Sequence, residues 1–181
     1  TARLVIILVG VTGLFGMNLN VIIPLQAQTV LDVGPTGLGL LLGALGVGAL
    51  SAALSLAFLG WKPHPRLLLG SAAAFGLGEV VLAEVTVFAV ALPLLVIVGF
   101  FMVFLVTLSN ITLQTTTPDA LRGRVLSVLT TVFAGTAPIG SLFAGSVVEA
   151  FGVPAAFAIG GVASVGVVLL GCVLLAGCRS D

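Results

Sequence analysis

The sequence predicts an all-α membrane protein with six transmembrane helices. Hydrophobic residues make up 60% of its 181 residues and charged residues only 7%, whereas roughly 25% of an average soluble domain is charged. So few charges cannot cover the surface of a compact soluble domain of this length. Long apolar windows separate the charged side chains. No segment alternates apolar and polar residues in the way that the strands of a membrane β-barrel do.

The windows between charges define the spans, because roughly 20 apolar residues in a helix cross the hydrocarbon core of a bilayer. One window is interrupted by Glu79. An ionised side chain near the centre of a span costs about 2.5–3.5 kcal/mol. The leucine, valine and phenylalanine residues around Glu79 return about 0.3–0.6 kcal/mol each, which nearly balances that cost. The predicted helices are therefore 3–28, 36–59, 66–86, 88–113, 118–149 and 153–177.

Local signals support these helices in turn. Pro24 lies inside the first helix and is expected to bend it. Pro35-Thr36 precedes the second helix, with Thr36 as the N-cap, and the fourth fills the charge-free window 85–118. The fifth begins at Thr117-Pro118-Asp119, where a threonine cap and proline are followed by an acid that the helix dipole favours. Gly152-Val153-Pro154 forms the turn before the sixth helix.

The basic residues predict the topology of the chain. Six spans place both termini on one side of the membrane, and all six lysine and arginine residues fall on that side. Basic residues collect on the cytoplasmic side of membrane proteins. We therefore expect a multi-pass protein of the inner membrane with both termini in the cytoplasm. The basic side carries Arg3, Lys62, Arg66, Arg122, Arg124 and Arg179, and the opposite side carries Asp32, Glu84 and Glu149.

Several classes of function lack their usual sequence signals. The net charge is zero without a basic run, so nucleic acid is not an expected partner. One histidine, His64, and no acidic cluster predict no metal site and no cofactor. We expect no enzyme, since no serine neighbours His64 and neither GxSxG nor HExxH occurs. Cys172 and Cys178 lie six residues apart on one helix and cannot pair.

A resemblance to a known family is carried by the run Pro118–Ser127 and the residues around it. Asn110 and Gln114 precede that run; Gly135, Pro138–Ser141 and Ala144-Gly145 follow it; and the helix with Leu38–Leu41 and Gly46–Leu50 lies upstream. These features resemble the transmembrane secretion effector branch of the major facilitator superfamily, which includes enterobactin exporters. The resemblance covers nearly the whole chain.

This resemblance implies the C-terminal six helices of a twelve-helix protein, with the N-terminal half absent from this sequence. It also fits an inverted repeat of two three-helix units, residues 1–87 and 88–181. The second and fifth helices both carry small residues four apart, Gly39/Gly43 and Ser141/Gly145, a spacing that lets helix backbones approach closely. The loop 60–66 departs from the family pattern because it contains no aspartate.

The candidate substrate residues are Asn20, Asn18, Phe100, Phe101 and Phe104. Asn20 shares a stripe of the first helix with small residues, and the resemblance implies that this helix and the fourth line a cavity. An aromatic patch suits an apolar drug or a catechol-like compound. The alternatives are interhelical hydrogen bonds for the asparagines and lipid contact or core packing for the phenylalanines.

Glu79 is the candidate for proton coupling, because it is the only acid well inside a span and no basic residue lies at its depth. Such a group must be protonated, face water or await a cation. Gate and kink positions come from the resemblance, with topology and lipid contact as the alternative reading of the two arginines. Pro138 is expected to kink its helix. The gate and kink residues are Arg122, Arg124, Gly135, Pro138, Gly140 and Gly145.

The predicted function is therefore half of a secondary active transporter, which exports a small amphipathic compound such as a drug or siderophore by proton-coupled alternating access. Its expected partners are membrane lipid, the small-molecule substrate, and the missing N-terminal half or a second copy of itself. The alternatives are an inactive structural fragment or pseudo-half, and a channel-like membrane subunit. An aquaporin-like channel would carry Asn-Pro turns, and no Asn-Pro occurs here.

Overall fold

The computed structural model describes residues 2–60 and 64–177 and consists there of seven α-helices. Six stretches are long and apolar enough to cross a membrane, the first of them being Val5–Thr29. The predicted all-α fold with six spans is confirmed. The helices are α1 (Ala2–Phe15), α2 (Leu19–Thr29), α3 (Pro35–Leu59), α4 (Pro65–Ala83), α5 (Phe88–Thr116), α6 (Asp119–Phe151) and α7 (Val153–Gly177).

The first span is broken at Gly16–Asn18, which corrects the prediction of one helix over 3–28 that bends at Pro24. Pro24 lies inside α2 without ending it. At the break, the main-chain N–H groups of Gly16 and Met17 both donate to the Thr12 carbonyl, at 2.8 and 2.9 Å. The side chain of Asn18 donates to the Leu14 carbonyl at 2.8 Å. In a continuous helix that carbonyl would accept the main-chain N–H of Asn18, so this side chain replaces a helical bond and favours the break.

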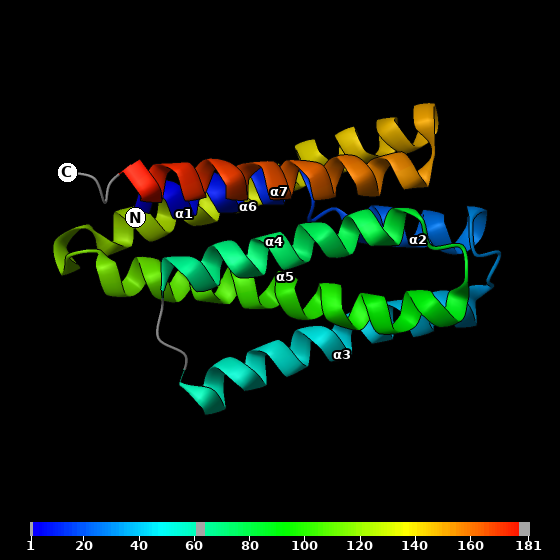
Figure 1. The fold of residues 1–181 in the computed structure, drawn as a ribbon, viewed down its shortest axis with the longest axis horizontal. Helices are drawn as coiled ribbons and strands as arrows, with labels where there is room; N and C mark the ends of the chain where they lie inside the picture. Colours follow the sequence, from blue (N-terminus) through cyan, green and yellow to red (C-terminus); the bar gives the residue numbers. More distant parts are fainter. Residues whose placement is uncertain (1, 61–63, 178–181) are drawn as a thin grey trace.

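The two ends of the bundle differ in charge. One end of the bundle, the terminal end, holds the start of α1, the end of α3, the start of α4, the turn between α5 and α6 and the end of α7 (Figure 1). The connections from α2 to α3, from α4 to α5 and from α6 to α7 lie at the opposite end. Lys62 and Arg179 fall outside the described residues. The other residues of the topology prediction separate as expected, with Arg66, Arg122 and Arg124 in elements at the terminal end and Asp32, Glu84 and Glu149 at the other.

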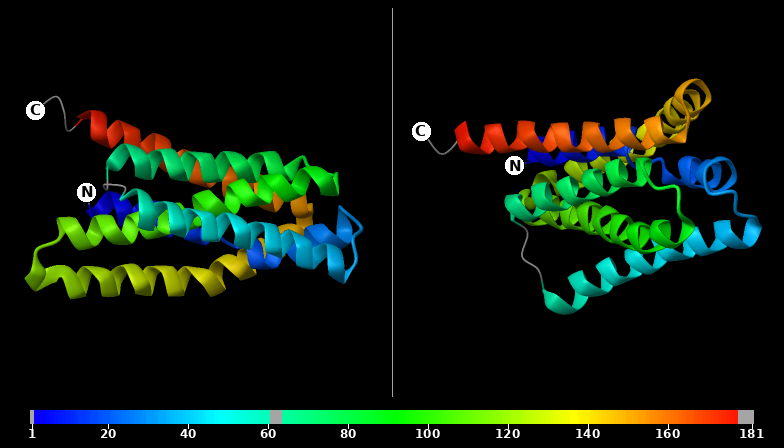
Figure 2. Two further views of the ribbon diagram at one scale, coloured as in Figure 1. Left: turned by 90° about the horizontal axis from the view of Figure 1, so that it is seen from below. Right: turned by 45° about the vertical axis from the view of Figure 1, so that its right-hand side comes forward.

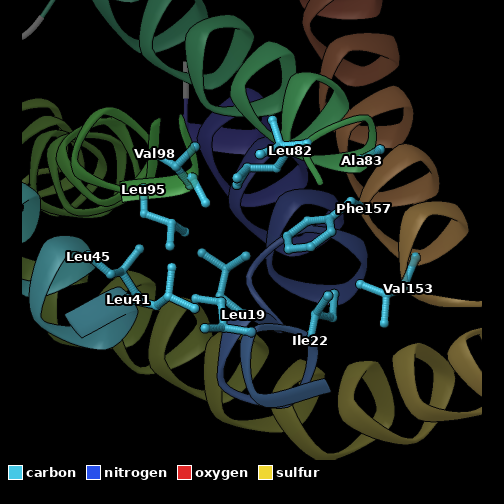
Figure 3. Packing of buried hydrophobic residues seen from close by; sticks show 14 of the residues in the cluster. Leu19, Ile22, Leu41, Leu45, Leu82, Ala83, Leu95, Val98, Val153 and Phe157 are labelled. Carbon is cyan, nitrogen blue, oxygen red and sulfur yellow. The ribbon is translucent and has the colours of Figure 1, made fainter. Parts of the chain in front are cut away.

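The core is made by helices that are distant in the sequence. Side chains of α2, α3, α4, α5 and α7 converge on one buried cluster, with Leu41 and Leu45 of α3 facing Leu95 of α5 (Figure 3). Phe157 of α7 is fully buried in the same cluster. A second cluster joins α1, α4 and α5 toward the terminal end and includes Leu8, Leu68, Leu105 and Leu108.

Several helix pairs approach closely at glycine, though not at the predicted pairs of small residues four apart. A methyl group on Gly99 of α5 would overlap the Leu45 carbonyl of α3, and one on Gly76 of α4 would lie 2.8 Å from the Gly161 carbonyl of α7. The predicted small-residue positions Gly39, Gly43 and Gly145 face open space within the described chain. Close contacts at glycine therefore join α3 to α5 and α4 to α7, and Gly140 and Gly160 bring α6 and α7 equally close to α1.

Helix α6 lies at the margin of the bundle and presents apolar side chains outward. Ile139 is 62% and Leu142 is 77% exposed. Figure 2 shows that α6 changes direction in its yellow middle part, and Pro138 lies inside this helix. The division into repeats at residues 1–87 and 88–181 stays a prediction.

Candidate functional site

A cavity of about 320 Å³ lies where the broken first span meets α5 and α6. No charged side chain lines it, and its polar groups are one amide and two hydroxyls in an otherwise apolar wall. The lining consists of Gly13, Met17, Asn20, Met102, Val103, Val106, Thr107, Phe133, Thr136 and Ala137.

Asn20 lies in this cavity, whereas Asn18 does not contribute to its lining. Asn18 is buried, and its side-chain amide donates to the Leu14 carbonyl. A methyl group on Gly140 would lie 2.7 Å from either polar atom of that amide, so Asn18 fills the contact between the break and α6. In this structure Asn18 packs at the break, and the predicted role of Asn18 in substrate binding stays a prediction.

The three candidate phenylalanines do not line the cavity that contains Asn20. They are Phe100, Phe101 and Phe104. They line a separate cavity of about 340 Å³ between α5 and the start of α4, together with Arg66, Leu67, Gly70 and Ser71. Within this patch the rings of Phe100 and Phe104 stack with centroids 5.6 Å apart. The ring of Phe100 meets Phe101 edge to face at 5.3 Å. The sequence placed these residues on the correct helix but on the wrong side of it for the Asn20 cavity.

Polar cavity residues that the sequence analysis missed come from α5 and α6. Thr107 and Thr136 line the Asn20 cavity. A smaller adjoining cavity of about 130 Å³ shares Val106 and Phe133 with it and is lined by Ser109. The Ser109 hydroxyl is buried without a hydrogen-bond partner among the described residues. Threonine and serine are common in membrane helices, so their residue type alone carried no signal.

Glu79 is completely buried in α4, on the side of the broken span that faces α4 and α7. Its side chain has no exposed surface, and neither carboxyl oxygen has a hydrogen-bond partner in the described part of the chain. A methyl group on Gly16 would lie 2.8 Å from the Oε2 atom of Glu79 and 3.0 Å from the Ser164 hydroxyl. That hydroxyl donates to the Gly160 carbonyl at 2.9 Å. The carboxyl group therefore lies against the break without a donor.

The predicted gate and kink residues have different surroundings. Arg122 forms an ion pair with Asp119 one turn earlier, at 2.6 Å, and Arg124 is exposed. Gly140 is buried against the Leu14 carbonyl, 2.5 Å from the position of an added methyl group. Gly135 and Gly145 face open space within the described chain. Of the predicted gate and kink glycines, only Gly140 contacts the break.

The description of the matching family agrees with this membrane architecture. A family model described as "Transmembrane secretion effector" matches residues 1–179. The chain belongs to the transmembrane secretion effector family of major facilitator transporters. In the described ranges, no three histidine, cysteine, aspartate or glutamate side chains are grouped as metal ligands would be.

Curated relatives of this family member are named as efflux pumps. The chain is 33% identical over 124 residues to a "Multidrug efflux pump Tap" of Mycolicibacterium fortuitum. It is 32% identical over the same length to the pump of that name in Mycobacterium tuberculosis strain H37Rv. Each match covers 68% of this chain but only 30% of the relative. No solved structure matches the chain. Family membership and the six apolar stretches make this chain a multi-pass membrane protein.

Proposed function

We propose that this chain forms half of a secondary active exporter, which carries small amphipathic compounds across the inner membrane by alternating access. The observation that carries the proposal is the uncharged cavity beside a broken membrane helix. Interrupted helices line the substrate sites of many secondary transporters. The names of the relatives agree with export of drugs.

The lining of the cavity favours an uncharged amphipathic substrate such as a drug or a neutral siderophore. An amide and two hydroxyls provide donors and acceptors for a few polar atoms, while the methionines and Phe133 provide adaptable apolar contacts. A fully charged substrate would have no opposite charge in this lining. Asn20 is the residue that we expect to orient the substrate.

Glu79 supports proton coupling because its surroundings suit only an uncharged acid. An ionised carboxylate without donors in a low-dielectric interior carries a cost of several kcal/mol. We therefore assign to Glu79 the binding and release of the coupling proton. Ionisation then requires a rearrangement that supplies donors or water, and such a rearrangement is what couples proton movement to transport.

The open faces of α3 and α6 support assembly with a second six-helix half, either in the same protein or in a second copy. Leu40 of α3 is 53% exposed and Leu142 of α6 is 77% exposed, and the small residues Gly39 and Gly145 face open space in the described structure. A transport pathway lies between two such halves. Cytoplasmic termini follow from the basic residues at the terminal end.

The cavity is tested with the protein expressed from its complete gene and reconstituted in liposomes, using Nile Red as a neutral amphipathic probe. We expect Asn20→Leu to lower the rate of Nile Red export at least tenfold, because the amide is lost from the cavity. Phe100→Leu is the matched control in the separate cavity and keeps more than half of the rate. Equal effects of the two substitutions would remove the Asn20 cavity from the proposal.

Coupling is tested in the same liposomes by imposing a pH gradient. We expect wild-type protein to concentrate Nile Red against its gradient, and Glu79→Gln to allow only downhill exchange. If wild-type protein allows only downhill flux of Nile Red, and the pH gradient does not accelerate this flux, the result would favour the alternative of a channel-like membrane subunit. If a correctly folded protein allows no flux of Nile Red at all, the result would favour the alternative of an inactive structural fragment or pseudo-half.

A further inference from the structure

The break in the first span contacts both the buried acid and the cavity. Gly16 lies against Glu79, as the distance of 2.8 Å from an added methyl group to Oε2 shows. The next residue, Met17, lines the cavity, and so does Asn20 in the first turn of α2. Asn18 between them is held by its bond to the Leu14 carbonyl and by contact with Gly140. A short irregular segment thus joins two sites on different sides of the span.

We propose that the Gly16–Asn18 break is the mechanical link through which proton binding at Glu79 and substrate binding in the cavity change each other's affinity. This inference rests on the proposed function, in which Glu79 carries the coupling proton. Two sites are coupled when both bias the same two-state element. An irregular segment in contact with both sites is such an element, whereas the neighbouring helices contact only one of them closely.

The main-chain N–H groups at the start of α2, directly after the break, explain why ionisation of Glu79 would move this segment. The first residues of a helix leave N–H groups without main-chain partners, and Asn18, the N-cap of α2, makes no capping hydrogen bond with its side chain. The Ser164 hydroxyl already donates to Gly160. The uncapped first turn of α2, which directly follows the break, therefore has main-chain donors that an ionised carboxylate could use. Movement of this turn toward an ionised Glu79 displaces Met17 and Asn20 in the cavity wall.

No other charge competes for Glu79 in the helices packed around it. α5 carries no aspartate, glutamate, lysine or arginine, and neither does α7 over its length. The first span is free of charge from residue 4 to residue 31. Arg66, at the start of α4, lies about 20 Å away along the helix at 1.5 Å per residue. Helix α7 also carries the titratable thiol of Cys172, but that side chain is exposed, whereas Glu79 is buried.

The experiment measures the link directly in purified protein, expressed from its complete gene, as the dependence of Nile Red affinity on pH. The affinities of the two protonation states are expected to differ by about 5–150-fold in the wild type, as is typical of coupled sites. In weakly buffered solution, binding of Nile Red should then change the number of protons that are bound to the protein. Gly16→Ala forces the Glu79 carboxyl group to shift, and we expect it to reduce this affinity ratio to below twofold while Nile Red still binds.

Gly10→Ala is the matched control on the same span. Its added methyl group would meet only the Cγ1 atom of Val132, at 3.3 Å, and no atom of the Glu79 side chain. We expect this variant to keep the wild-type affinity ratio. If Gly16→Ala also keeps it, while Glu79→Gln abolishes it, the link is wrong although Glu79 remains the coupling site. If Glu79→Gln keeps the ratio as well, the coupling role in the proposed function is wrong.

A second variant covers the case in which Gly16→Ala does not fold. Asn18→Ala removes the bond to the Leu14 carbonyl without adding bulk. We expect it to lower the affinity ratio at least threefold, because the segment is no longer held in one arrangement. A wild-type ratio in folded Asn18→Ala protein would overturn the link.

Discussion

The contact between α4 and α7 provides a sharp test of the packing. Two glycines of α7 lie five residues apart and differ only in their surroundings. A methyl group on Gly161 would lie 2.6 Å from Val80 Cγ2, 2.9 Å from the Val80 main-chain nitrogen, and still closer to the Gly76 carbonyl. A methyl group on Gly166 would meet nothing within 4 Å. Gly161→Ala and Gly166→Ala therefore form a matched pair.

Backbone atoms cannot rotate away, so α7 must separate from α4 to accept Gly161→Ala. An ordinary carbon contact of about 3.5 Å requires a shift of roughly 0.6 Å from the Val80 nitrogen, and more from the Gly76 carbonyl. Overpacking of this kind costs about 1–3 kcal/mol. Gly166→Ala creates no overlap, and alanine exceeds glycine in helix propensity by up to about 1 kcal/mol.

The two free energies of unfolding are measured by SDS titration in mixed micelles, with circular dichroism as the signal. We expect Gly161→Ala to unfold at lower SDS fraction than the wild type, and Gly166→Ala at the same or a higher fraction. Identical transitions for both variants would refute the close approach of α4 and α7. That result would also undermine the position of Glu79, because the same two helices enclose it.

Three further predictions concern the core, the topology and the surface. Phe157→Ala is expected to destabilise the fold by about 3–5 kcal/mol, since Phe157 is fully buried. Phe58→Ala is the control and should change the SDS transition little, because the Phe58 side chain is 83% exposed. With the native cysteines replaced by alanine, Arg124→Cys should be labelled by an impermeant maleimide only from the cytoplasm and Glu84→Cys only from outside. Labelling of both from one side would contradict six spans. Asp119→Asn should alter stability by less than about 1 kcal/mol because its ion pair with Arg122 is exposed, and a larger loss in the SDS titration would show that this pair supports the loop.

The spans could be predicted from the sequence because hydropathy and charge are properties of single segments. The predicted ends agree with the observed ones to within about two residues where a proline or glycine marks the turn, as at Pro35 and Gly152. The caps are different: the N-cap of α3 is Gly34 and not Thr36, and that of α6 is Pro118 and not Thr117. The fourth predicted helix stopped at residue 113, while α5 continues to Thr116. The break at Gly16–Asn18 could not be predicted in the same way, since it depends on an asparagine side chain that takes over a main-chain acceptor.

The role of each small residue depends on its neighbours, and this information is absent from one helix alone. Gly43 and Gly99 are equally suited to close packing by residue type. Only Gly99 meets another backbone in the described structure, because α5 faces α3 there. The aromatic patch has the same explanation: Phe100 and Asn20 lie on spans that neighbour each other, but they face different cavities. Helical periodicity fixes which residues share a face and leaves open which neighbour that face meets.

The burial of Glu79 is the feature that stability alone explains least. In the sequence of its own helix, the free-energy cost of inserting an ionised Glu79 into the membrane is nearly balanced by the surrounding leucine and valine residues. The structure removes the residue from both lipid and solvent and gives its oxygens no donor in the described part of the chain. A leucine or glutamine at this position would avoid the cost of an unpaired acid. An acid held against the irregular segment of the first span is better explained by the proposed change in its charge during transport, which makes Glu79→Gln the substitution with the most to reveal.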